Sequence, residues 1–352
     1  MSAIPYADID AGQRRRVGWL LAAWAAMVLL IVVIGGVTRL TESGLSITEW
    51  APVTGIIPPL SQQTWGEAFE AYQRIPQYQQ LNRGMTLDEF KTIYFWEYVH
   101  RLWARLIGLV IAVIFVYFLV RGGLSKQLNW RLATLLLLTA GQGALGWFMV
   151  TSGLAERTEV SQYRLAAHLG LALIIYVLAV WTAADLFWAD TLARESPPSS
   201  AFQRAVGWIT IFVFVTAMAG SFVAGLDGGR VYNTFPLMDG RWVPGGYFSL
   251  TPWWKNLFEN VIAVQFNHRW MAVGTLGAIV YVWLHGRRMN LGSTARRWLH
   301  SLPVAGLFQV VLGIGTLILV VPVWLAALHQ AGAILLLTVS LLLYHSLIRT
   351  PS

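Results

Sequence analysis

Eight apolar runs divide the 352-residue chain, and each is long enough to cross a bilayer. A bilayer core of about 30 Å needs about 20 apolar residues in a helix. Only 12% of the residues are charged, whereas about a quarter are charged in soluble domains. We therefore expect an all-α integral membrane protein with eight transmembrane helices. The runs are Val17–Val37, Phe95–Val120, Leu132–Val150, Leu165–Phe187, Val206–Ala224, Leu257–Leu284, Leu299–Val321 and Trp324–Leu347.

The distribution of basic residues predicts the orientation in the membrane. An even number of spans places both termini on one side. If that side is the inner one, the inner segments hold thirteen Lys and Arg residues and the longer outer segments hold nine. Positive charge gathers on the cytoplasmic side, so both termini are expected in the cytoplasm. The net charge of +8 then reflects orientation, and we expect contact with lipid and no nucleic-acid partner.

Recurring motifs predict that the chain is a duplicated four-helix unit. We expect an N-terminal half (1–189) with a long outer loop (39–94), a cytoplasmic linker (190–205) and a C-terminal half (206–352). Residues of the first half recur 161 to 168 positions later in the second. The matches are Glu97-Tyr98-Val99-His100-Arg101 with Gln265-Phe266-Asn267-His268-Arg269, Gln142 and Gly146 with Gln309 and Gly313, and His168 with His329.

Four histidines, His100, His168, His268 and His329, fall at matching levels in the outer half of the expected bundle. A single intramembrane histidine is often a hydrogen-bonded packing residue. Four at repeated positions favour function, because ionisable groups at this depth are costly. With no cysteine in the chain and no carboxylate partner, a facing pair of imidazoles favours axial ligation of haem iron over a zinc site. His285, His300 and His345 lack repeat partners and are interpreted as interfacial.

Glu97 distinguishes the two halves. It stands three residues before His100 on the same helix face, whereas its counterpart Gln265 does not ionise. We infer that the first half holds a reacting molecule and the second a permanent cofactor. An ion pair between Glu97 and Arg101 is the structural alternative and is compatible with a role in the chemistry.

Arg101 and Arg269 follow the first histidine of each half. Either is suited to bidentate pairing with a haem propionate. The alternative is that their side chains reach out of the membrane to the polar interface.

These stretches resemble those of the haem A synthase family. The resemblance rests on Gly35-Gly36-Val37-Thr38-Arg39-Leu40-Thr41, Ser43-Gly44-Leu45-Ser46, Trp50 through Pro58-Pro59, Ala224-Gly225-Leu226-Asp227, Tyr232-Asn233-Thr234-Phe235-Pro236-Leu237-Met238 and the motifs around the four histidines. It covers nearly the whole chain. Some members carry a cysteine pair in the outer loops, and this chain has none, as in the proteobacterial and mitochondrial branch.

The resemblance implies oxidation of the C8 methyl group of haem o to a formyl group, which gives haem a for terminal oxidases. It also implies haem b as cofactor on His268 and His329, substrate haem at His100 and His168, and a requirement for Glu97. A bacterial inner membrane is the expected location. An electron donor, the farnesyltransferase that makes haem o and a second copy of the chain are the partners to be considered.

Two other classes of protein remain open at this stage. A b-type cytochrome subunit that carries electrons across the membrane also uses paired histidines, although such proteins more often stack two haems on one helix pair. A haem carrier or transporter also shows parallel repeats, although broken helices are then expected near the midplane. Whether iron activates oxygen or water traps a carbocation is not decided by the residues.

Overall fold

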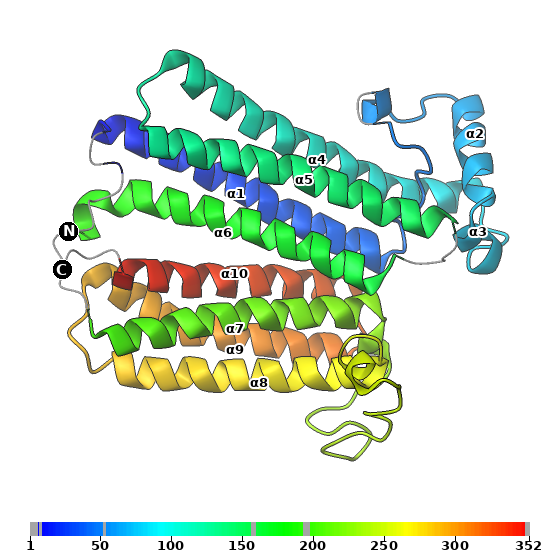
Figure 1. Cartoon of the computed structure of the whole chain (residues 1–352). Helices are drawn as coiled ribbons and strands as arrows, with labels where there is room; N and C mark the ends of the chain where they lie inside the picture. The colour runs from blue at the N-terminus through cyan, green and yellow to red at the C-terminus, as the bar shows by residue number, and fades with distance from the viewer. Residues whose placement is uncertain (1–5, 7–8, 52–53, 156–159, 193–197, 349–352) are drawn as a thin grey trace.

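The computed structural model describes residues 6, 9–51, 54–155, 160–192 and 198–348, without the side chains of 152–155 and 189–192. Within this part of the chain, eight long helices run alongside one another (Figure 1), and each corresponds to one predicted run. They are α1 (Ala11–Leu40), α4 (Leu87–Arg121), α5 (Lys126–Ala155), α6 (Gln162–Leu192), α7 (Ser200–Gly225), α8 (Val261–Gly286), α9 (Ser293–Ile318) and α10 (Val323–Ile348).

Seven of these helices are long and apolar enough to cross a membrane, and α8 is the exception. With 26 residues, α8 is as long as α9 and α10. Its mean hydropathy is lowered by the polar residues of its first half, which are Gln265, Asn267, His268 and Arg269. The chain is therefore an all-α membrane protein with seven or eight candidate spans. The polar residues that weaken α8 as a span are those singled out above as candidate site residues.

The helices pack in two groups of four (Figure 1). In the first group α1 contacts α4 and α6, and α5 contacts α4 and α6; in the second, α7 and α9 each contact α8 and α10. The groups meet where α10 packs on α1 and α6 and where α7 packs on α6. At the end of the bundle that carries the two long loops, named the outer end for the expected orientation, an ion pair of 2.9 Å joins Arg39 to Asp227 across this boundary. The start of α1 and the end of α10 lie at the same end of the bundle (Figure 1).

The bundle core is apolar, and two tryptophan side chains of the bundle bond their indole N–H groups to backbone carbonyls. The fully buried Trp24 of α1 donates its indole N–H to the Ile107 carbonyl of α4 at 3.0 Å. Trp103 likewise donates to the Met27 carbonyl at 3.0 Å. An indole N–H without a partner would be costly in this environment, so these bonds lock α1 and α4 in register.

The long outer loop of the first group folds into a small unit of its own. It contains the turn η1 (Thr54–Ile56) and the short helices α2 (Gln62–Gln73) and α3 (Pro76–Gln80). A second apolar cluster, centred on Leu45, Tyr72, Ile75 and Phe90, holds these elements against the start of α4. The outer loop of the second group carries the turns η2 (Gly228–Arg230) and η3 (Trp253–Leu257).

Capping side chains explain why α4 and α8 begin where they do. Thr86 and Glu89 form a reciprocal capping box at the start of α4, and the Asn260 side chain accepts from the N–H groups of Ile262 and Ala263 at the start of α8. Such side chains bond amides that otherwise lack partners. As a result α4 begins eight residues before the predicted span at Phe95, outside the apolar stretch.

One prediction about the end of the bundle opposite the long loops needs correction. His345 is buried rather than interfacial, and its Nε2 lies 2.7 Å from the Asp185 carboxylate, which also accepts from Arg131 at 2.8 Å. Burial of the histidine is tolerated because this charged partner is present. Within the linker expected over 190–205, α6 continues to Leu192 and α7 begins at Ser200; residues 193–197 lie outside the described residues, and the linker stays a prediction.

Candidate functional site

Each of the four predicted histidines lies against a glycine of the preceding long helix. A side chain larger than hydrogen at these glycines would press on the imidazole ring, so the glycines set how closely the rings approach the neighbouring helix. The distances from an added Cβ to the nearest ring atom are 3.1 Å for Gly35 and His100, 3.1 Å for Gly146 and His168, 3.0 Å for Gly220 and His268, and 2.8 Å for Gly313 and His329.

In the second group, His268 and His329 face one another with ring centroids 6.4 Å apart and planes at 83°. A metal–nitrogen bond of about 2 Å on each side and roughly 1 Å from each nitrogen to its ring centre add up to roughly 6 Å. The spacing therefore suits two imidazoles on opposite sides of one metal ion. Among the described residues no group of three or more His, Cys, Asp or Glu is placed to hold a metal.

Hydrogen bonds fix both rings of this pair. The Nδ1 atom of His268 lies 3.1 Å from the Thr216 carbonyl, which only accepts, so Nδ1 carries the proton and Nε2 keeps its lone pair. This is the arrangement that metal-ligating histidines usually show. His329 is held by Gln309, whose amide nitrogen lies 3.1 Å from the ring Nδ1 and 2.9 Å from the His329 carbonyl.

The pair in the first group is less constrained. Gln142 donates to the His168 carbonyl at 2.9 Å, but the buried Nδ1 of His168 has no hydrogen-bond partner among the described residues. His100 is close enough to His168 to interact with it electrostatically. It turns its Nε2 edge toward Gly35, whereas the other three rings present Cε1 to their glycines. The histidines of the second group thus both have hydrogen-bonded rings, whereas in the first group the His168 ring has no such bond among the described residues.

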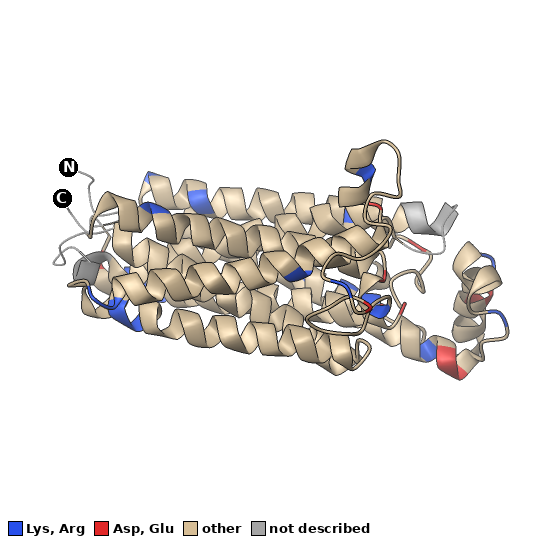
Figure 2. Ribbon diagram, turned by 90° about the horizontal axis from the view of Figure 1, so that it is seen from below, with Lys and Arg blue, Asp and Glu red and all other residues tan. Residues whose placement is uncertain are grey.

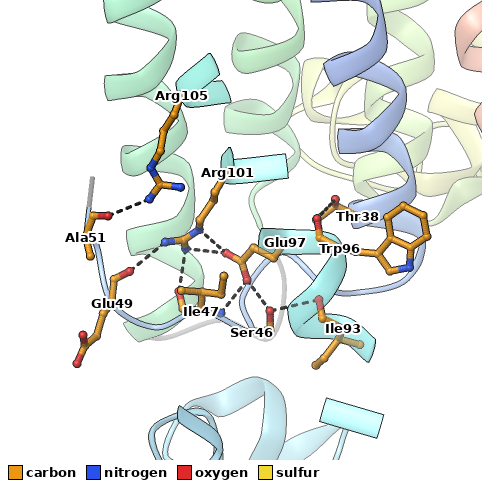
Figure 3. Close-up of polar contacts among 10 residues, drawn as sticks. All are labelled: Thr38, Ser46, Ile47, Glu49, Ala51, Ile93, Trp96, Glu97, Arg101 and Arg105. Atoms are coloured by element: carbon orange, nitrogen blue, oxygen red, sulfur yellow. Dashed lines mark hydrogen bonds and ion pairs between the residues drawn. The ribbon is translucent and has the colours of Figure 1, made fainter. Parts of the chain in front are cut away.

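Glu97 lies at the outer edge of the first pair and is buried, with 3% of its side chain exposed. Figure 3 shows its carboxylate between α4 and the outer loop. Oε2 accepts from the Ser46 hydroxyl and the Ile47 N–H, both at 2.7 Å, and Oε1 accepts from Arg101 at 2.6 and 3.0 Å. The ion pair considered for Glu97 and Arg101 is confirmed. Because four donors fill both oxygens, a proton reaches Glu97 only when one contact opens.

Arg101 and Arg269 clamp the two outer loops in the same way. Arg101 donates to the carbonyl groups of Ile47 at 2.8 Å and Glu49 at 2.9 Å (Figure 3). Arg269 donates to two carbonyls with the same spacing in the second loop, those of Tyr232 and Thr234. Both guanidinium groups are therefore anchored to protein rather than extended into the interface. Their pairing with a propionate stays a prediction.

Several contacts at this site escaped the sequence reasoning. Ser46 and Thr216 belong to no recognisable motif. The Ser46 hydroxyl and the Thr216 carbonyl acquire a role only through Glu97 and His268, which are distant in the sequence. Gly35 and Gly220 were detectable, since they lie 185 residues apart, as do Ile47 and Tyr232 and also Glu49 and Thr234. A repeat search over the first helix of each half would have found this second spacing.

Comparison with known proteins places this arrangement in a family. Residues 18–341 match the COX15-CtaA family, described as cytochrome oxidase assembly protein. The Heme A synthase of Nitrosomonas eutropha is 48% identical over 324 residues, covering 92% of this chain and 91% of that protein. The Heme A synthases of Nitrosospira multiformis and Parvibaculum lavamentivorans are 48% and 47% identical, each over 94% of this chain and over 93% and 94% of their own lengths.

These matches span both helix groups, both outer loops and all four histidines. The chain therefore belongs to the COX15-CtaA family of cytochrome oxidase assembly proteins, and within that family to the haem A synthases.

Proposed function

We propose that the chain oxidises the C8 methyl group of haem o to a formyl group, with a permanent haem b in the second helix group and the substrate haem in the first. The near-full-length similarity to haem A synthases supports the overall conversion. The assignment of the two sites rests on one observation: His268 and His329 have ring hydrogen bonds, whereas the His168 ring has none among the described residues.

The two sites have different requirements that match this contrast. A resident cofactor benefits from ligands fixed in advance, since pre-organisation lowers the cost of binding. A substrate must enter, turn over and leave, which favours ligands that exchange. We therefore propose that His268 and His329 would hold haem b, which would supply one-electron chemistry when bound, and that His100 and His168 would hold the haem that reacts.

The two helix groups are proposed to be copies of one ancestral unit of four transmembrane helices. The supporting observations are the glycine behind each histidine and the arginine clamp on each outer loop. The left-handed residue after the first helix of each group is a third: Glu42 has φ 55° and Asp227 has φ 50°. Such values are uncommon outside glycine, so their recurrence at equivalent positions favours a shared origin.

Glu97 is the proposed acid and base of the first site. Conversion of a methyl to a formyl group removes hydrogen, so a group near the reacting carbon must take up protons. The carboxylate oxygen Oε2 is the natural acceptor, because its bond to the Ser46 hydroxyl gives a proton a short route to or from the outer loop. The Arg101 contacts hold the opposite oxygen in place meanwhile.

The proposed setting is a bacterial inner membrane with both termini in the cytoplasm. The ribbon of Figure 2 is in keeping with this orientation, because Lys and Arg residues occur at the end near the two termini, whereas Asp and Glu residues lie mainly at the opposite end. The enzyme that farnesylates haem is a proposed partner because its product is the substrate here. An electron donor must also dock, and a second copy of the chain stays open.

The test is extraction and chromatography of the haems from purified protein and three variants. The parent should hold haem b together with haem o or haem a. His268→Ala should lose haem b, and Glu97→Gln should retain haem b and accumulate unconverted haem o. Glu70→Gln, at an exposed carboxylate, is the matched control and should behave as the parent. Normal haem a in the Glu97→Gln protein would refute the role of Glu97, and two haem b per chain in every sample would refute the proposed substrate site.

A further inference from the structure

Two adjacent glycines of α1 lie between the two histidine pairs. Gly35 abuts the His100 ring, and a Cβ on Gly36 would lie only 1.7 Å from the side-chain oxygen of Gln330. Gln330 directly follows His329 on α10. The contact between Gly36 of α1 and Gln330 of α10 therefore lies between the two histidine pairs. On one side of it is the α1 backbone that touches His100, and on the other is the residue next to His329.

The route between the pairs through this contact is short. In α1 the route consists of the peptide unit between Gly35 and Gly36. In α10 it consists of the peptide unit between His329 and Gln330. The gap between them is the approach of the Gln330 amide oxygen to the Gly36 Cα, close enough for a Cα–H···O contact. Only a glycine permits this approach, because any side chain at position 36 would occupy the place of the amide.

The surrounding structure keeps the contact in register. Arg39, one turn further along α1, is ion-paired with Asp227 of the second group at 2.9 Å. Its side chain is 17% exposed and that of Asp227 is 40% exposed, so this pair guides alignment more than it adds stability. The Arg39–Asp227 ion pair and the Gly36–Gln330 contact thus both connect the two helix groups. The Gly36–Gln330 contact lies deeper in the bundle, between the histidine pairs.

We propose that Gly36 and Gln330 form the positioning contact through which electrons pass between the two haem sites, an inference that rests on the proposed function. Each passage oxidises one ferrous iron to ferric at one site and reduces one ferric iron to ferrous at the other. No bond is made or broken, and the rate depends on how closely the connecting groups approach.

Gly36→Ala is the informative variant because the displaced atom is the far end of a flexible side chain. The Gln330 amide turns aside, so the helices stay packed and both haems stay bound while the contact is lost. Gln330→Ala removes the same contact from the other side. Gly108→Ala is the matched control, since a Cβ there meets nothing within 4 Å.

The measurement uses protein that holds haem b in the second site and haem a, the product, in the first, because the two absorb at different wavelengths. After a sub-stoichiometric addition of reductant, rapid-mixing absorbance follows the redistribution of the electron between them. Both single variants should slow this several-fold at unchanged haem content and unchanged reduction potentials. The double variant should be no slower than either single variant, as expected when two residues act through one contact.

Two failures are distinguishable. If the parent itself holds no pair of haems, the proposed function is wrong and this inference falls with it. If the Gly36→Ala and Gln330→Ala proteins retain both haems and redistribute the electron at the parental rate, the proposed function stands and the contact is not the path. Slowing in Gly108→Ala to the same extent would likewise overturn the inference.

Discussion

Gly313 offers a direct test of the geometry assigned to the cofactor site. A Cβ at this position would lie 2.8 Å from Cε1 of His329, 3.3 Å from Nδ1 and 3.5 Å from Nε2. Carbon atoms pack best about 3.5 to 4.0 Å apart, so in Gly313→Ala the ring must retreat by roughly 1 Å. A metal–nitrogen bond of about 2 Å does not stretch to that extent, and the ligand is therefore displaced.

The effect on stability should be small while the effect on haem is large. Alanine favours the helix by about 1 kcal/mol over glycine, whereas overpacking costs about 1 to 3 kcal/mol. The folded protein is then destabilised by about 2 kcal/mol at most. The overpacking strain of up to about 3 kcal/mol weakens haem b binding by up to about 140-fold when converted at 1.4 kcal/mol per tenfold.

The assay is the haem b content of purified protein, with the low-spin ferric signal in electron paramagnetic resonance as a second readout. Gly277→Ala is the matched control, because a Cβ there meets nothing within 4 Å. Gly146→Ala, which presses on His168 instead, should retain haem b and lose bound haem o. A Gly313→Ala protein with full haem b and an unchanged signal would refute the reasoning.

Two further predictions concern the rest of the molecule. Asp185→Leu should lower the free energy of unfolding by about 3 to 5 kcal/mol, because it leaves Arg131 and His345 without their buried partner; unchanged thermal unfolding in detergent would contradict this. Burial raises the pKa of Tyr72 in the outer unit, so the neutral side chain stabilises that unit. This contribution is fully present below the ordinary tyrosine pKa of about 10. It is lost as the pH rises above that value toward the pKa of the folded state. Tyrosinate absorbance against pH should show delayed ionisation that Tyr72→Phe removes, and an identical titration in both proteins would refute it.

The helices were predictable because length and apolar content determine them almost alone. The four histidines were predictable for a related reason, since a repeat makes equivalent positions visible without knowledge of contacts. The ends of the helices were harder to predict from the sequence. Hydropathy marks only where the apolar stretch begins, whereas α4 begins at Leu87 because Thr86 and Glu89 cap it.

The contacts that distinguish the two sites were not predictable in this way. The Thr216 carbonyl meets His268 because α7 and α8 pack in one particular register, and Ser46 meets Glu97 because the outer loop folds back on α4. His345 was misplaced for the same reason. Its position near a helix end suggested the interface, but the carboxylate that allows its burial lies 160 residues away on α6.

The most direct test of the central claim is haem analysis of bacterial membranes that lack any other haem A synthase and contain an enzyme that makes haem o. With this chain present, we predict that the extracted haems include haem a at the expense of haem o, and that Glu97→Gln restores haem o. Membranes that contain the folded chain with haem b bound, yet accumulate only haem o, would contradict the account.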